Sequence, residues 1–85
     1  KLNIINTSIK LPITISVNSK NYNLVKELEI KLQDLDLVSS YYIDYFSNED
    51  VIYKIIYNST PNKFINEFKN SNIKLNTNSS IWSIE

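Results

Sequence analysis

The sequence predicts an α+β sandwich in which a four-stranded antiparallel sheet carries two helices on one face. Two segments space their apolar residues as a helix does, and four others alternate them as strands do. Along the chain these segments run strand, helix, strand, strand, helix, strand. Eighty-five residues are enough for one core, so we expect a single domain over residues 11–85.

The first strand and the first helix follow from apolar spacing. In "KLPITISVN", apolar and polar residues alternate from Ile13 to Val17, which indicates a half-buried strand. The segment "SKNYNLVKELEIKLQDL" then has one apolar helix stripe, made of Val25, Leu28, Leu32 and Leu35 with Leu24 beside it. It predicts a helix of about 14 residues, capped at its start by Ser19 or Asn21.

The remaining elements are two strands, a short helix and a last strand. Strands are expected near Val38–Phe46 and Val51–Asn58, joined by "SNED". In "STPNKFINEFKNSN", Thr60 is the expected N-cap and Pro61 the first helical residue. This helix should end near Asn70 or Asn72, because Asn tolerates the left-handed backbone conformation.

The segment "IKLNTNSSIWSIE" predicts the last strand, with Trp82 and Ile84 on one face. The complete order is that of the ferredoxin-like βαββαβ sandwich, with strand order 4-1-3-2. Residues 1–10 are expected to be a lead-in segment or an extra edge strand, and the whole chain to be cut from a longer protein.

The register between the two aromatic strands can be predicted by counting residues outward from the turn. A three-residue turn at 48–50 places an opposite-charge pair and two apolar pairs together on one face, which favours this register. The pairs on that face are Phe46–Ile52, Asp44–Lys54 and Tyr42–Ile56, and those on the other are Tyr45–Tyr53, Ile43–Ile55 and Tyr41–Tyr57. Since both helices cover one face, we expect the second set to be core, together with Ile13, Ile15 and Val17.

Tyr42, Phe46, Ile52 and Ile56, around Asp44 and Lys54, therefore form the candidate contact surface on the helix-free face. Its expected partner is another protein, a flanking domain or a second copy of the chain. Incidental exposure of these side chains stays open as an alternative. RNA-recognition domains stack bases on this face, but they have aromatic residues where this chain has Thr14 and Ser16.

Composition narrows the function classes further. Nine Lys balance nine acidic residues and there is no Arg, so binding to nucleic acid is not expected. No apolar run approaches the roughly 20 residues of a membrane span. Without His, Cys or Gly, we expect no metal site, no cofactor and no phosphate-binding loop. No set of residues suggests acid–base or nucleophilic catalysis, so an enzyme is not expected.

An alternative function is small-molecule sensing. Regulatory modules of the ACT type share the expected topology and bind amino acids at the loop between the first strand and the first helix. Asn18, Ser19, Asn21 and Asn23 would be the ligand-binding residues here.

The positions Ser19, Tyr22, Leu32, Leu35 and Val38, the stretch "NEDVIYKIIY" from Asn48, and Trp82 with Ile84 resemble the ferredoxin-like modules of an uncharacterised proteobacterial envelope family. This resemblance implies a bacterial protein of the envelope or periplasm, with the cytoplasm left open. Asn, Ile, Lys and Tyr have AT-rich codons, and their abundance indicates an AT-rich genome. We therefore expect a non-catalytic interaction or assembly module of a larger protein, which uses the helix-free face or an exposed strand edge.

Overall fold

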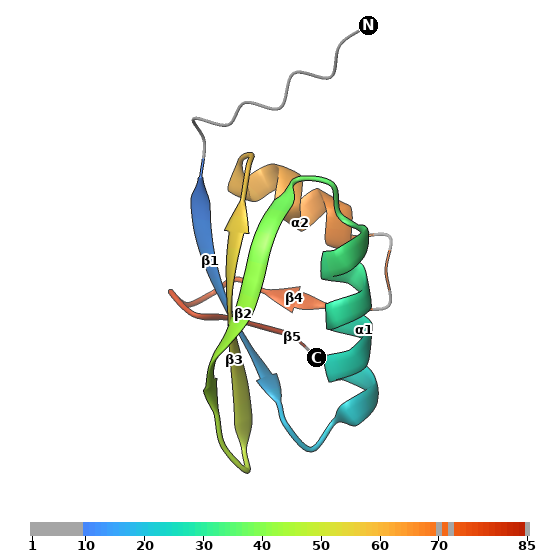
Figure 1. Ribbon diagram of the computed structural model, residues 1–85, viewed down its shortest axis with the longest axis vertical. Coiled ribbons are helices and arrows are strands. Elements are labelled where there is room, and N and C mark those ends of the chain that lie inside the picture. The colour runs from blue at the N-terminus through green and yellow to red at the C-terminus, as the bar shows by residue number, and fades with distance from the viewer. Residues whose placement is uncertain (1–9, 70, 72, 85) are drawn as a thin grey trace, which may run out of the picture.

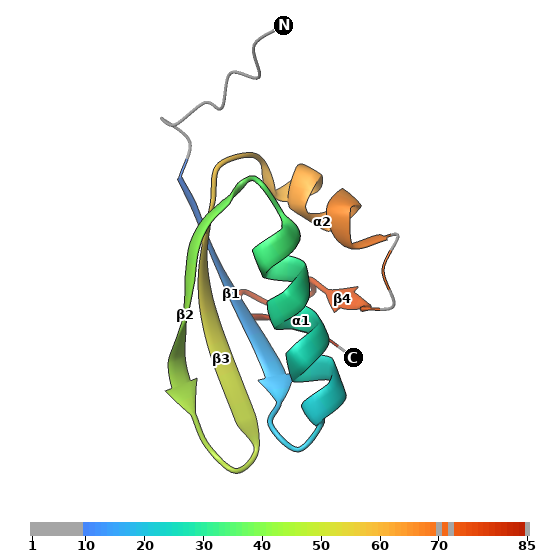
Figure 2. The same ribbon diagram turned by 45° about the vertical axis from the view of Figure 1, so that its right-hand side comes forward.

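The computed structural model describes residues 10–69, 71 and 73–84, which form one mixed sheet with two helices on one of its faces (Figures 1 and 2). In chain order the elements are β1 (Leu11–Asn18), α1 (Tyr22–Asp34), β2 (Val38–Phe46), β3 (Asp50–Tyr57), α2 (Pro61–Lys69), β4 (Leu75–Asn76) and β5 (Trp82–Ile84). The five strands lie in the order β2-β3-β1-β5-β4.

The predicted four-stranded antiparallel sheet of order 4-1-3-2 is wrong. Strand β3 does lie between β1 and β2, antiparallel to both. The difference is at the C-terminal end, where two short strands replace the single expected one. Strand β5 pairs in parallel with β1, with Ile15 opposite Trp82, and β4 pairs with the outer side of β5. The sheet is therefore mixed and five-stranded, and the fold is not the ferredoxin-like sandwich.

The C-terminal segment forms a hairpin because its middle is polar and bonds to its own backbone. The backbone N–H of Asn78 donates to Oδ1 of Asn76 at 3.0 Å, and the Ser79 hydroxyl donates to the carbonyl oxygen of Ile81 at 2.6 Å. Asn and Ser side chains stabilise turns in this way. The chain reverses, and Leu75 faces Ile84 across the hairpin.

The N-caps of both helices are confirmed. Oδ1 of Asn21 accepts a hydrogen bond from the backbone N–H of Leu24, and Oγ1 of Thr60 accepts one from Lys63 at 3.3 Å. The predicted end of the second helix, at Asn70 or Asn72, lies outside the described residues. The same holds for residues 1–9 of the predicted lead-in.

The core lies between the sheet and the two helices. Alternate residues of β1 and β3 form its floor, and leucines of α1 and phenylalanines of α2 cover them. The buried side chains are Ile13, Ile15, Val17, Leu24, Leu28, Leu32, Val51, Tyr53, Ile55, Tyr57, Phe64, Phe68, Ile73 and Ile84. The predicted core faces of β1 and β3 are therefore correct.

The predicted register between β2 and β3 is wrong, and the first cause is the loop. The backbone N–H of Ser47 donates to the carbonyl oxygen of Asp50 at 2.8 Å, so only Asn48 and Glu49 lie between them. The Ser47 hydroxyl also accepts hydrogen bonds from the backbone N–H groups of Glu49 and Asp50. The loop is thus one residue shorter than predicted, and Phe46 faces Val51 instead of Ile52.

The second cause is a β-bulge at Asp44. Ile43 faces Tyr53 and Tyr45 faces Ile52, so Asp44 is an extra residue without a partner of its own in β3. The predicted Asp44–Lys54 pair is consequently wrong, and Lys54 lies opposite Tyr42. A second register shift, at Ser39, follows further along β2.

The short loop and the bulge at Asp44 each shift the register by one residue, and together they decide which face each of these β2 residues takes. For the residues before Asp44, the loop and the bulge together shift the pairing by two residues from the predicted register. A shift of two preserves the face of a side chain, so Tyr41, Tyr42 and Ile43 lie on their predicted faces. After Asp44 only the shorter loop shifts the pairing, by one residue, so Tyr45 and Phe46 each lie on the face predicted for the other. Tyr45 lies on the helix-free face, and Phe46 lies on the helix face.

Candidate interaction surface

Strand β2 is an edge of the sheet and carries a row of exposed apolar side chains. Ile43 and Phe46 lie on the helix face, exposed by 50% and 70%. Tyr42 and Tyr45 lie on the helix-free face, and each is 56% exposed. We call these four residues the β2 edge surface. Ile43 and Tyr45 were expected in the core, but at the edge of the sheet the helices leave them exposed.

The predicted contact residues do not all lie together. Tyr42, Ile52, Lys54 and Ile56 share the helix-free face, where the last three are half-buried. Phe46 lies on the opposite face, and Asp44 is the bulge residue. Lys54 is flanked by Thr14 of β1 and by Tyr42 of β2. The exposed apolar surface therefore follows the edge of the sheet rather than one of its faces.

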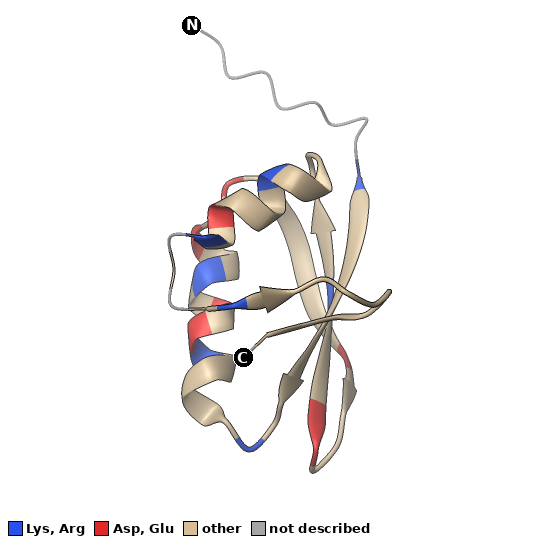
Figure 3. Ribbon diagram, turned by 180° about the vertical axis from the view of Figure 1, so that it is seen from behind, with Lys and Arg blue, Asp and Glu red and all other residues tan. Residues whose placement is uncertain are grey.

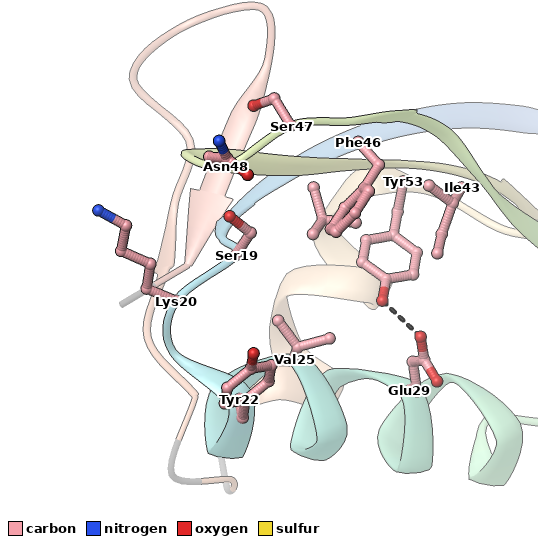
Figure 4. A pocket seen from close by; sticks show the side chains of 11 residues that line it. Ser19, Lys20, Tyr22, Val25, Glu29, Ile43, Phe46, Ser47, Asn48 and Tyr53 are labelled. Carbon is pink, nitrogen blue, oxygen red and sulfur yellow. Dashed lines mark hydrogen bonds between the residues drawn. The ribbon is translucent and has the colours of Figure 1, made fainter.

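A pocket of about 440 Å³ lies beside the β2 edge surface, between the start of α1 and the β2–β3 hairpin (Figure 4). Ile43, Phe46 and Tyr53 extend from the strands toward α1, which contributes Tyr22, Val25 and Glu29. The remaining lining residues are Ser19, Lys20, Ser47, Asn48 and Val51. At one end, the backbone N–H of Ser19 donates to the carbonyl oxygen of Glu49 at 3.1 Å and joins the two loops.

Two tyrosines of β3 each bond to a helix carboxylate. The Tyr53 hydroxyl donates to Glu29 of α1, and the Tyr57 hydroxyl donates to Glu67 of α2, both at 2.5 Å. Burial raises the pKa of both hydroxyls well above the ordinary value of 10.0, and the hydrogen bonds to Glu29 and Glu67 raise it further. Both phenols therefore stay neutral donors up to high pH.

Glu29 and Glu67 were not predicted from the sequence. A Glu in an amphipathic helix usually faces solvent, and neither residue was singled out. One signal was present: Glu29 follows Val25 by four residues, and Glu67 follows Phe64 by three, so both lie beside the apolar stripe. A carboxylate in that position needs a donor from the sheet, and a tyrosine can supply one.

Of the four residues predicted for ligand sensing, one lines the pocket and two bond to the backbone through their side chains. Ser19 lines the pocket. Oδ1 of Asn18 accepts from the backbone N–H of Lys20 at 2.9 Å, and Asn21 caps α1. Asn23 is exposed on α1 and is not part of the pocket lining.

Charged side chains are found mainly on the helices and loops (Figure 3). Within the described strands they are Asp44, Asp50 and Lys54. Over residues 10–69, 71 and 73–84, no three His, Cys, Asp or Glu side chains come together as metal ligands. Neither described helix has the length and apolar content needed to cross a membrane.

The pocket has mainly apolar walls with charged groups at few positions. Of the side chains that line it, Lys20 and Glu29 carry charge, and the Glu29 carboxylate is already bonded to the Tyr53 hydroxyl. Val25, Ile43 and Phe46 give it apolar walls that suit an aliphatic or aromatic group. The arrangement therefore offers an apolar recess next to an exposed strand.

The chain matches no protein-family model, and neither a search of curated proteins nor a search of solved structures finds a match. The resemblance to a proteobacterial envelope family therefore stays a prediction.

Proposed function

We propose that this domain is a non-catalytic protein-interaction module and that its contact surface is the β2 edge surface. One observation carries the proposal. β2 is nine residues long, lies at the edge of the sheet and exposes four large apolar side chains on its two faces. An edge strand offers unpaired backbone N–H and C=O groups to another chain, and the apolar side chains add buried area when one binds.

The composition of β2 supports this role. Edge strands that avoid association are usually short, carry Lys, Pro or inward-pointing charges, or contain bulges, and of these features β2 has the bulges. In β2 there is no Lys and no Pro, and Asp44 is its one charged residue. The opposite edge of the described sheet, β4, is two residues long and offers little to a partner.

Site-specific photo-crosslinking in cells that express the protein tests the proposal. A photo-reactive amino acid replaces Tyr42 in one sample and Lys63, which is exposed on α2, in the control. We expect a discrete adduct from position 42, identified by mass spectrometry, and none from position 63. The identified partner, once purified, should bind the wild type at least tenfold more tightly than Tyr42→Lys. Absence of an adduct at 42, or equal adducts at both positions, would contradict the proposal.

Small-molecule sensing remains a second candidate because the pocket of about 440 Å³ adjoins Ser19 in the predicted loop. A thermal-shift screen with amino acids and nucleotides separates the two functions. A sensor gains about 2.7 kcal/mol of stability at a ligand concentration of 100 Kd, and Val25→Lys should abolish that gain. An interaction module shows no shift with any of these compounds.

A further inference from the structure

We infer that the partner of the β2 edge surface is a second copy of this chain, paired antiparallel through β2 about a two-fold axis. This inference deepens the proposed function and rests on it. It would join two five-stranded sheets into one continuous sheet. Four observations support it: the exposed apolar area, the symmetry of the edge, the charge along it and the position of the bulges.

The exposed area reaches what a stable dimer needs. Tyr22 at the start of α1 is 81% exposed and lies across the pocket from Phe46, so it adds to the β2 edge surface. An aromatic side chain buries about 150–250 Å², and Tyr22, Tyr42, Tyr45 and Phe46 are each more than half exposed. Burial of this surface removes on the order of 500 Å² from each copy. Two copies together bury about 1,000 Å², the lower bound for a specific interface.

Symmetry favours an antiparallel pair of identical edges. A two-fold axis perpendicular to the sheet keeps the helix faces of both copies on one side and the helix-free faces on the other. With the axis at Tyr42, Tyr42 meets its counterpart on the helix-free side, and Ile43 and Phe46 face Tyr41 and Val38 of the second copy on the side of the helices. Since β2 exposes apolar side chains on both faces, each side of the seam gains apolar contacts.

Charge and the bulges select the register. The longest run of regular pairing in β2 lies between the shifts at Ser39 and Asp44, and its centre is at Tyr41 and Tyr42. An axis through Tyr42 places Asp44 opposite Ser40 of the second copy, whose hydroxyl can donate to the carboxylate. The two Asp44 carboxylates are then four residues apart, about 13 Å, which exceeds the physiological Debye length of about 8 Å. An axis at Asp44 would instead place like charges directly opposite each other.

The net charge of the chain does not oppose association. Nine Lys and nine acidic residues give a formal charge of zero, so two copies do not repel each other over long distances.

Molecular mass in solution, measured by light scattering over a concentration series, tests the inference. We expect the wild type to move from 9.9 kDa toward twice that mass as concentration rises. Tyr42→Lys should stay monomeric at every concentration, because a Lys on an edge strand opposes pairing. Ile81→Lys is the matched control, because Ile81 is 46% exposed next to β5 and lies far from β2 in the order of the sheet. This variant should dimerise as the wild type does. Circular dichroism confirms that both variants are folded.

A disulfide experiment tests the register, because the chain has no cysteine of its own. Facing Cβ atoms in an antiparallel pair lie about 4.5–5.5 Å apart, close to the distance that a disulfide bridges. Tyr42→Cys should therefore oxidise to a covalent dimer at least tenfold faster than Ile81→Cys at equal concentration. Equal rates would overturn the pairing about Tyr42.

A wild type that stays monomeric up to about 1 mM would overturn self-association, because the free energy of dimerisation would then be smaller than about 4 kcal/mol in magnitude. That result is distinguishable from failure of the proposed function. If the photo-reactive residue at position 42 still forms an adduct with a different protein, the interaction function stands and the second-copy inference falls. If it forms none, both fall.

Discussion

At the scale of single residues, Tyr53 and Tyr57 show how a polar group is accommodated in this core. Both side chains are fully buried, yet each hydroxyl reaches a half-buried glutamate on a helix. A buried hydroxyl without a partner would cost about 1–3 kcal/mol, so the two glutamates remove a penalty that the tyrosines would otherwise impose. Each pair also connects one helix to the interior strand β3 at a defined point.

The raised pKa of these two hydroxyls predicts loss of stability in alkaline solution. In the unfolded chain both tyrosines ionise near pH 10, whereas in the folded protein they stay protonated above it. Their contribution is therefore complete below pH 10 and is lost as the pH rises through the pKa of the folded state. Each group lowers the free energy of unfolding by up to about 1.4 kcal/mol per pH unit in that window.

Urea unfolding at several values between pH 9 and pH 11.5 measures this slope. The double variant Tyr53→Phe/Tyr57→Phe should show a flatter dependence than the wild type. The matched control is Tyr42→Phe/Tyr45→Phe, which removes two exposed hydroxyls and should keep the wild-type slope. If the core variant and the control have the same slope, the buried tyrosines do not cause the dependence.

At the scale of elements, the bulge at Asp44 sets the exposed surface of β2. Without Asp44, Ile43 opposite Tyr53 and Tyr45 opposite Ile52 would be consecutive pairs of a regular ladder. Asp44 can therefore be removed without any other β2 residue changing face. Bulges are one way in which edge strands limit association, so its removal also leaves a flatter edge.

Deletion of Asp44 should accordingly leave the domain folded, with its free energy of unfolding within about 1 kcal/mol of the wild type. It should also strengthen self-association, seen as a lower concentration at the midpoint of dimerisation. Deletion of Tyr42 is the matched control, because it moves every preceding β2 residue to the other face. We expect that deletion to cost several kcal/mol. Equal destabilisation by both deletions would mean that Asp44 is not an unpaired bulge residue.

The sequence was a good guide where one face of an element is apolar and the other polar. The alternation from Ile13 to Val17 predicts β1, and the leucine stripe predicts α1, with its cap at Asn21. Thr60 and Pro61 likewise mark the start of α2. In these segments only one orientation of the element buries the apolar side chains, and the spacing of those residues predicts it.

The register of β2 could not be read in the same way. The stretch "YYIDYF" is apolar on both faces, so a shift of one residue exchanges one apolar side chain for another. The loop depends on a hydroxyl, that of Ser47, which shortens it by one residue. Strand β4 has two residues, too few for alternation to be recognised, so of the two C-terminal strands only β5 was predicted. The exposed residues of β2 were accordingly predicted only in part: Tyr42 and Phe46 were expected on the surface, but Ile43 and Tyr45 were expected in the core.

At the scale of the whole molecule, Phe64 connects elements from three parts of the chain. Its ring lies 4.9 Å from that of Tyr57 in β3, 4.7 Å from Phe68 in α2 and 6.1 Å from Trp82 in β5, measured between centroids. The side chain is fully buried. It is therefore where β3, α2 and the C-terminal hairpin meet.

Phe64→Ala should lower the free energy of unfolding by about 3–5 kcal/mol. A domain of this size has roughly 4–13 kcal/mol in total, so the variant should unfold well below the wild-type temperature. Phe64→Leu, which keeps most of the volume, should cost less than half as much. Thermal and urea denaturation measure both. A cost below about 1 kcal/mol for Phe64→Ala would show that the three elements are held together elsewhere.

The insertion of β5 beside β1 has a consequence for the order in which the protein folds. Strand β1 is among the first described residues and β5 among the last, yet Ile15 and Trp82 are neighbours in the sheet. During synthesis, one side of β1 therefore stays open until the residues of β5 have left the ribosome. Contacts between such distant residues slow folding, and in that interval β1 is a second unpaired strand. A protease cut shortly before Trp82 would make that transient exposure permanent, so pairing with β5 protects β1 from association with other chains.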